Sequence, residues 1–171
     1  MTAAFVIEPL PKSHDRRGFV SGNARVDAYF RHTVSQDVKR CYAACFVARD
    51  MATGRVGGFY TLSSNSVPLT DVPDGLARKL PRYPTVPAVL MGWLGRDDAF
   101  RGRGLGAALV FDAIRTVATA PIASHALFAD AIDAPAARFY AELGFVPLTD
   151  KPMRLFLPIA TGLALLNSGR A

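Results

Sequence analysis

The chain has 171 residues, half of them hydrophobic, and its 20 lysines and arginines against 14 acidic residues give a formal net charge of +6. This length fits one domain with a buried core, and the composition excludes an intrinsically disordered chain. No apolar run reaches the roughly 18 residues of a membrane span, and residues 1–10 lack the features of a secretory signal, so we expect a cytoplasmic protein.

The first half of the chain combines short apolar runs with one amphipathic segment. Residues 5–10 predict a strand, and residues 26–38 predict a helix whose apolar side chains share one face. Residues 43–49 and 55–62 predict an antiparallel hairpin with glycine at its turn. A loop rich in proline follows, with a short helix expected at 74–80.

Basic residues are concentrated in the first quarter of the chain. Residues 12–42 contain seven lysines and arginines against three aspartates. A concentrated basic face is typical of a protein that binds a polyanion, and a solvated helix surface is the alternative.

The cysteines and histidines form no metal-binding pattern. Cys41 and Cys45 have no second Cys or His pair spaced to complete a zinc site, so we expect buried thiols and no metal. His14, His32 and His125 are scattered, and we assign them neither to metal binding nor to catalysis.

A strand, a basic glycine turn and a helix occupy the centre of the chain. Residues 89–94 form an apolar run of strand length, and apolar residues recur at helical spacing from 110 to 117, after the turn RGRGLG at 101–106. The first N–H groups of a helix lack partners and its dipole favours an anion there. Because glycine allows close backbone approach and Arg101 and Arg103 add positive charge, we expect this turn to hold a pyrophosphate.

Three alternative roles for this turn fit its residues less well. A plain connector seldom needs alternate glycines flanked by arginines, and a Walker loop would need Gly-Lys-Ser/Thr. A dinucleotide-binding fingerprint fits formally through Gly102, Gly104 and Ala107, with Asp130 further along. That fingerprint should follow its strand at once, whereas residues 95–101 intervene here.

The second half of the chain continues the alternation of strands and helices. Pro121 ends the central helix, and residues 125–131 predict the next strand. Asp133 is expected to cap another helix, with Pro135 in its first turn and Gly144 after its last residue.

Two closing strands, at 145–148 and 153–157, complete the predicted order. This order predicts an α/β (α+β) fold with a single mixed central β-sheet and helices on both faces. We expect one domain over residues 1–158 and a C-terminal tail over 159–171.

The form R-x-x-G-x-G between a strand and a helix resembles the coenzyme-A loop of the GCN5-related N-acetyltransferases. Residues 139–145, FYAELGF, lie where that family carries F-Y-x-x-x-G-F. The resemblance implies splayed central strands, acetyl-coenzyme A as acyl donor, and a pantetheine arm pairing with backbone at 94–96, where Arg96 replaces the usual aliphatic residue. The implied cofactor-binding residues are Leu94, Gly95, Arg96, Arg101, Gly102, Arg103, Gly104, Leu105, Gly106, Ala107 and Phe139.

Tyr140 is the expected catalytic residue, because acetyl transfer requires a proton for the departing thiolate. A phenol with a pKa of about 10 can donate to a thiolate whose conjugate acid has a pKa of about 8.5. The alternative is a core aromatic beside Phe139 and Phe145. The backbone N–H of Leu94 or Gly95 is a candidate for stabilising the oxyanion.

Residues 89–94 contain no Asp, Glu or His, whereas relatives that act on lysine commonly carry a carboxylate on this strand. A lysine amine, with a pKa of about 10.4, is almost wholly protonated at neutral pH, but an α-amine with a pKa of about 7.7 is partly neutral. The missing base therefore favours an α-amine substrate, with a water, Asp97 or Asp98 left open as the base.

Much of the chain further resembles the acetyltransferase toxins of bacterial toxin–antitoxin pairs. The similar segments are 19–30 with 36–37, 58–63, 80–87 and 153–158. This resemblance implies acetylation of the α-amine of aminoacyl-tRNA, a block of translation, a homodimer and a ribbon-helix-helix antitoxin. These toxins often carry arginine where this chain has Trp93. The residues expected to bind tRNA are Arg16, Arg17, Arg25, Arg31, Lys39, Arg40 and Trp93.

Two alternative functions remain open. The protein would acetylate protein or small-molecule amines if the basic face were merely solvated. It would be a coenzyme-A-binding regulatory module if it bound the cofactor without turnover, although the phenol of Tyr140 argues against this.

Overall fold

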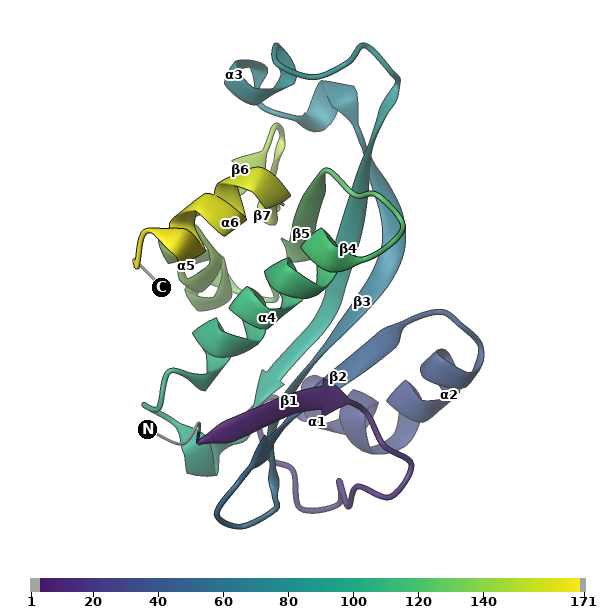
Figure 1. Ribbon diagram of the computed structural model, residues 1–171, viewed down its shortest axis with the longest axis vertical. Coiled ribbons are helices and arrows are strands. Elements are labelled where there is room, and N and C mark those ends of the chain that lie inside the picture. Colours follow the sequence, from purple (N-terminus) through teal and green to yellow (C-terminus); the bar gives the residue numbers. More distant parts are fainter. Residues whose placement is uncertain (1–3, 170–171) are drawn as a thin grey trace. The chain divides into compact units, whose positions relative to one another are not determined.

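A computed structural model describes residues 4–169, so residues 1–3 of the predicted domain and residues 170–171 of the predicted tail lie outside the described part. Seven strands form one mixed sheet in the order β1-β2-β3-β4-β5-β7-β6 (Figure 1). The strands are β1 (Phe5–Pro9), β2 (Ala44–Asp50), β3 (Val56–Pro68), β4 (Thr85–Arg96), β5 (Ala126–Asp130), β6 (Val146–Leu148) and β7 (Lys151–Pro158). The predicted α/β fold with a single mixed sheet is confirmed.

All helices but the last lie between strands, in the chain order that the sequence predicts, and the last helix follows β7 in the predicted tail. They are α1 (Ala24–Ala28), a π-helix (Tyr29–Thr33), α2 (Val34–Lys39), α3 (Asp74–Ala77), α4 (Leu105–Thr119), α5 (Ala134–Glu142) and α6 (Ile159–Asn167), with short 3-10 turns at Leu69–Asp71 and Asp98–Phe100. The chain divides into two compact units. The first unit comprises residues up to Ser63 with Gly92–Ala113, and the second comprises Ser64–Met91 with the residues from Ile114 onward.

In the first unit, helices cover both faces of β3. Phe59 stacks on Phe30 of the π-helix with ring centroids 4.1 Å apart. The next residue, Tyr60, points to the opposite face, as successive strand residues do, and its hydroxyl donates to Asp112 of α4 at 2.7 Å. The predicted antiparallel hairpin is confirmed, since β2 pairs with β3 from Ala44 opposite Leu62 onward.

The predicted helix at 26–38 begins earlier and is not a regular α-helix. It begins at Ala24 because the side chain of Asn23 accepts hydrogen bonds from the backbone N–H groups of Arg25 and Val26. A π-helix then interrupts it at Tyr29–Thr33. The hydrogen bonds of a π-helix span one residue more than those of an α-helix. Apolar residues at α-helical spacing therefore do not predict this segment.

In the second unit, β4 runs parallel to β5 over a short stretch. Ala88 to Leu90 pair with Ala126 to Phe128, and the pairing ends there although β4 continues to Arg96. β7 pairs antiparallel with β5 and carries Leu157 opposite Leu127. Strand β4 is longer at both ends than the predicted 89–94, because Thr85, Pro87 and Gly95 break the apolar run without ending the strand.

The C-terminal helix packs within the second unit. Gly162 of α6 is buried, and a Cβ built on it would lie 3.1 Å from Ile114 and 3.2 Å from Leu157. Residues 159–167 of the predicted tail therefore form a docked helix.

Candidate active site

The glycine turn ahead of α4 presents backbone donors to open space. Gly102 and Gly104 have φ values of +76° and +71°, a region that side chains rarely adopt. A Cβ built on either glycine would meet no heavy atom within 4 Å beyond its chain neighbours. Within residues 4–169, the backbone N–H groups of Gly102, Arg103 and Gly104 have no hydrogen-bond acceptor. These donors and the first N–H groups of α4 can therefore receive an anion.

The two arginines of the turn are partly neutralised by aspartates. Arg101 Nη2 lies 3.0 Å from Asp98 Oδ1, and Arg103 Nη2 lies 3.7 Å from Asp50 Oδ1. The Arg103 guanidinium also lies over the ring of Phe5, 4.7 Å from its centroid. The arginines thus hold the turn in place in addition to contributing charge.

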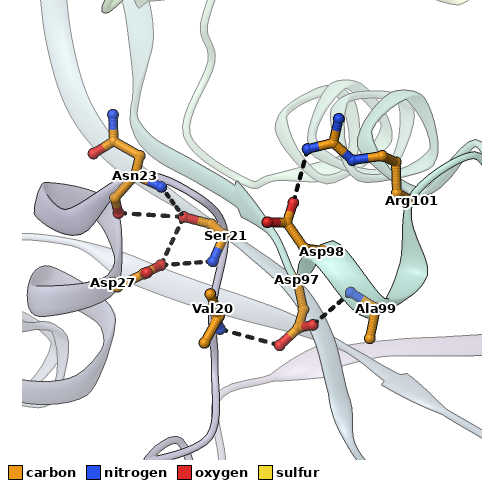
Figure 2. Close-up of polar contacts among 8 residues, drawn as sticks. All are labelled: Val20, Ser21, Asn23, Asp27, Asp97, Asp98, Ala99 and Arg101. Atoms are coloured by element: carbon orange, nitrogen blue, oxygen red, sulfur yellow. Dashed lines mark hydrogen bonds and ion pairs between the residues drawn. The ribbon is translucent and has the colours of Figure 1, made fainter.

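A buried carboxylate fixes the connection between β4 and α4 (Figure 2). Asp97 is 3% exposed and accepts hydrogen bonds from the backbone N–H groups of Val20 at 3.1 Å and Ala99 at 2.9 Å. The backbone N–H of Asp98 donates in turn to the carbonyl of Val20 at 2.8 Å. Since the Asp97 carboxylate is occupied by these donors and the Asp98 carboxylate by Arg101, both residues are structural in this geometry.

The segment around Val20, which Asp97 holds, is further fixed by hydrogen bonds to the start of α1 (Figure 2). The Ser21 hydroxyl donates to Asp27 Oδ1 at 2.6 Å, and the Ser21 backbone N–H donates to the same oxygen at 2.8 Å. The backbone N–H of Asn23 donates to the Ser21 hydroxyl at 3.2 Å. The sequence predicts no role in the site for Ser21, Asn23 or Asp27, although Ser or Asn directly ahead of a helix is typical of an N-cap.

Gly95 lies where β4 packs directly on the aromatic core of the first unit. A Cβ at this position would lie 2.7 Å from Phe59 Cε1 and 2.8 Å from Val26 Cγ1. Only glycine fits here without displacing core side chains.

Two other predicted residues on β4 are partly buried. The Trp93 ring stacks on Tyr29 with centroids 4.2 Å apart and planes inclined by 7°. Arg96 Nη1 is buried and has no hydrogen-bond partner among the described residues. This orphaned donor marks Arg96 as a residue with unused binding capacity.

Tyr140, in the second unit, is a buried phenol with a weak hydrogen-bond partner. Its side chain packs against Phe139 and Phe145, each with ring centroids 5.3 Å away, and the residue is 6% exposed. Its hydroxyl lies 3.9 Å from the sulfur of Met91. Burial raises the pKa of Tyr140 above its ordinary value, so the phenol is protonated at neutral pH. Tyr140 is thus a core aromatic residue that carries a neutral proton donor.

Three of the arginines expected to bind tRNA are engaged within the protein. Arg16 donates to the carbonyl of Phe30 at 2.9 Å and to the hydroxyl of Ser35 at 2.8 Å. Arg31 Nη2 donates to the carbonyl of Phe19. Arg17 Nη2 pairs with Asp15 Oδ2, two residues earlier in the chain, at 3.1 Å.

The other three basic residues in this set are exposed. Among the described residues, the side chains of Arg25, Lys39 and Arg40 make no ion pair or hydrogen bond, so they are available to an external anion.

No three His, Cys, Asp or Glu side chains in the range 4–169 are arranged to hold a metal ion. Cys45 is buried, and burial raises its pKa to about 12. The prediction of a buried thiol is wrong for Cys41, which is exposed because it follows the end of α2 in a left-handed turn with φ of +59°. Within the part of the chain that the structure describes, no helix is long and apolar enough to span a bilayer.

The sheet order, the central strand and the glycine turn at the start of α4 define the GCN5-related N-acetyltransferase fold. No protein-family model matches the sequence. The protein named Probable toxin TacT of Sinorhizobium fredii is 33% identical over 172 residues, covering 95% of each chain. A tRNA-acetylating toxin of Mycobacterium tuberculosis is 35% identical over 159 residues, covering 90% of this chain and 91% of the relative. The chain therefore belongs to the family of TacT and the tRNA-acetylating toxins.

Solved structures agree with this relationship. A crystal structure of a tyrosine-to-phenylalanine mutant of KacT matches with a TM-score of 0.87 and 26% identity, covering 95% of this chain and 99% of that one. AtaT complexed with acetyl-methionyl-tRNAfMet matches with a TM-score of 0.86 and 26% identity over the same shares. The resemblance inferred from the sequence motifs is confirmed.

Proposed function

We propose that this protein is a toxin that transfers the acetyl group of acetyl-coenzyme A to the α-amine of an aminoacyl-tRNA and so blocks translation. The observation that carries the proposal is the glycine turn before α4, whose backbone N–H groups are unpaired within the described residues, in a chain that belongs to this toxin family. A tRNA-acetylating relative and a neighbour bound to acetyl-methionyl-tRNA support the choice of substrate.

The residues of the turn fit acetyl-coenzyme A, which supplies an activated acetyl thioester. Gly102 and Gly104 leave open space beside the backbone donors, and this suits the oxygens of a pyrophosphate. Arg96 adds a buried donor without a partner in the described residues. We propose that the backbone at 94–96, near the end of β4, pairs with the amide groups of the pantetheine arm.

The nucleophile needs no strong base in this proposal. The carboxylates of Asp97 and Asp98 are held by Val20, Ala99 and Arg101. An α-amine with a pKa of about 7.7 is partly neutral at physiological pH and can attack without a dedicated base. The geometry therefore favours an α-amine over a lysine side chain.

Tyr140 is proposed to give its proton to the departing thiolate. Its raised pKa keeps the hydroxyl protonated, and its only described hydrogen-bond partner is a thioether sulfur, which is a weak acceptor. KacT and AtaT have both been solved as tyrosine-to-phenylalanine mutants, which supports a functional role for a tyrosine hydroxyl in this family.

An antitoxin partner and a homodimer are parts of the same proposal. AtaT has been solved with the C-terminus of its antitoxin AtaR, and we propose a ribbon-helix-helix antitoxin for this protein. The exposed Arg25, Lys39 and Arg40 are proposed to contact tRNA. Because charged tRNA is a cytoplasmic substrate, we propose that the protein acts in the cytoplasm.

The test is to incubate charged total tRNA with radiolabelled acetyl-coenzyme A and to identify the labelled species. We expect N-acetylated aminoacyl-tRNA, no labelling of deacylated tRNA, and growth arrest on expression that Tyr140→Phe relieves. Similar labelling of free amines or proteins would favour the alternative acetyltransferase. Cofactor that is bound but never consumed would favour a regulatory module.

A further inference from the structure

A pocket in the first unit is lined mostly by basic side chains. It has a volume of about 590 Å³ and lies beside the segment that precedes α1. Its charged and titratable lining consists of His14, Asp15, Arg16, Arg17, Arg31 and His32. The volume lies within the roughly 300–1,000 Å³ that is usual for ligand sites, and three arginines against one aspartate make its field positive.

The single acid in the lining is already paired. Arg17 Nε and Nη2 each lie 3.1 Å from an oxygen of Asp15, and the Arg17 backbone N–H donates to Asp15 Oδ1 at 3.0 Å. These contacts lower the pKa of Asp15 to about 2, so Asp15 stays ionised and bound to Arg17. The charges of Arg16 and Arg31 have no carboxylate partner among the described residues.

Arg31 carries an unused buried donor. Its Nη2 donates to the carbonyl of Phe19, whereas its Nε is buried without a hydrogen-bond partner in the part of the chain that is described. A buried polar group that is left unpaired is costly, and more so when it is charged, so an acceptor is expected at this site. Arg31 and His32 both lie on the π-helix, a distortion that is frequent at functional sites.

We propose that this pocket is a phosphate-binding site in which Arg31, with Arg17 and His32 at its rim, holds phosphate oxygens. Guanidinium groups match phosphate geometry, and the one carboxylate in the pocket lining, Asp15, is already paired with Arg17. The phosphate comes from the backbone of the tRNA substrate; this assignment of the source rests on the proposed function. A free phosphate compound is the other source of the same chemistry.

The first experiment measures binding of fluorescently labelled, deacylated total tRNA between 50 and 200 mM KCl, concentrations over which phosphate contacts lose affinity steeply. Arg31→Lys keeps the charge but removes the Nε donor, while Arg17→Gln and His32→Gln alter exposed side chains and should leave folding intact. We expect Arg31→Lys and Arg17→Gln each to raise the Kd about three- to tenfold, and Arg17→Gln to reduce the salt slope by about one. Arg115→Gln, an exposed arginine of α4 outside the pocket, is the matched control and should stay within about twofold of the native protein.

The second experiment uses inorganic phosphate as the probe and follows the Tm of the native protein and of Arg31→Lys. Stabilisation of the native protein alone, abolished by saturating tRNA, supports an RNA phosphate in the pocket. Stabilisation that persists with tRNA supports a small phosphate compound. Pocket variants that match Arg115→Gln in Kd and salt slope, with no phosphate effect on Tm, would overturn the site.

Failure of the pocket and failure of the proposed function give different results. Neither binding measurement requires acetyl transfer. Normal acetylation with tRNA binding independent of the pocket would refute the pocket alone. Pocket-dependent tRNA binding without acetylation would refute the proposed function alone.

Discussion

The buried carboxylate of Asp97 accepts a hydrogen bond from the backbone N–H of Val20, 77 residues earlier in the chain, at 3.1 Å. This contact ties the segment before α1 to the connection that leads into the glycine turn. Arg55 adds a longer ion pair to the same carboxylate, at 3.8 Å. The position of the glycine turn therefore depends on Asp97, which the sequence presents only as one of two adjacent aspartates.

Asp97→Ala should weaken acetyl-coenzyme A binding and destabilise the fold together. The change leaves the Val20 N–H without its acceptor, which costs about 1–3 kcal/mol. Urea unfolding and the KM for acetyl-coenzyme A measure the two effects. Asp74→Asn, at an exposed aspartate whose side chain does not cap its helix, is the control and should change neither value. An unchanged KM in Asp97→Ala would show that the anchor does not position the turn.

Gly104→Ala and Gly54→Ala form a matched pair that separates backbone strain from cofactor binding. The two glycines have φ values of +71° and +74°, and a Cβ on either would meet nothing within 4 Å beyond its chain neighbours. Each substitution should therefore lower stability by a similar amount, about 1–2 kcal/mol. Only Gly104→Ala should raise the Kd for acetyl-coenzyme A, by about tenfold, because the methyl group enters the space for the pyrophosphate and one hydrogen bond is worth about 1.4 kcal/mol. Equal Kd values for the two variants, measured by calorimetry, would contradict the assignment of the turn.

Gly95→Ala should destabilise the protein more than Gly92→Ala. A Cβ at Gly95 would lie 2.7 Å from Phe59, whereas a Cβ at Gly92 has its nearest neighbour at 3.4 Å, the hydroxyl of Thr61. Overpacking of this kind costs about 1–3 kcal/mol. Thermal unfolding of both variants checks the difference, and a smaller effect at Gly95 would mean that β4 shifts away from the core without cost.

Tyr140→Phe should lower kcat about 10²- to 10⁴-fold while leaving stability almost unchanged. The lost hydroxyl is the proposed proton donor, and its described partner is only the sulfur of Met91 at 3.9 Å. Tyr60→Phe should leave kcat almost unchanged and lower the free energy of unfolding by about 1 kcal/mol, because it removes a 2.7 Å hydrogen bond to Asp112. Single-turnover acetylation and urea unfolding distinguish the two variants. Native kcat in Tyr140→Phe would remove Tyr140 from the mechanism.

The rate of acetylation should rise with pH and then level off above about pH 8. The α-amine must be neutral to attack, and its pKa is about 7.7. Burial raises the pKa of Tyr140 above its ordinary value of 10, so the proton donor is retained throughout this range. Stability linked to Tyr140 is therefore fully present below pH 10 and is lost only as the pH rises through the higher native pKa. Initial rates from pH 6 to 9 test this, and a falling limb between pH 8 and 9 would contradict a neutral phenol donor.

The order of the elements, the central strand with its glycine turn, and the family could all be predicted from the sequence. Those features are local: alternate glycines flanked by arginines, helical spacing of apolar residues after them, and Asp133 as a cap are all read from neighbouring positions. Hairpin and cap signals depend on backbone conformations that a few adjacent residues fix.

Hydrogen bonds between residues that are distant in the sequence could not be predicted, and only the folded structure shows them. Asp97 is bound by Val20, and Arg31 by the carbonyl of Phe19, so residues that looked like a free base and a free tRNA contact have structural partners. The same folding leaves Arg31 Nε buried and unpaired, among the described residues, beside a basic pocket. The charge and spacing of residues predict which chemistry each side chain can perform. The burial and the hydrogen-bond partners of a side chain depend on chain segments that meet only when the core forms.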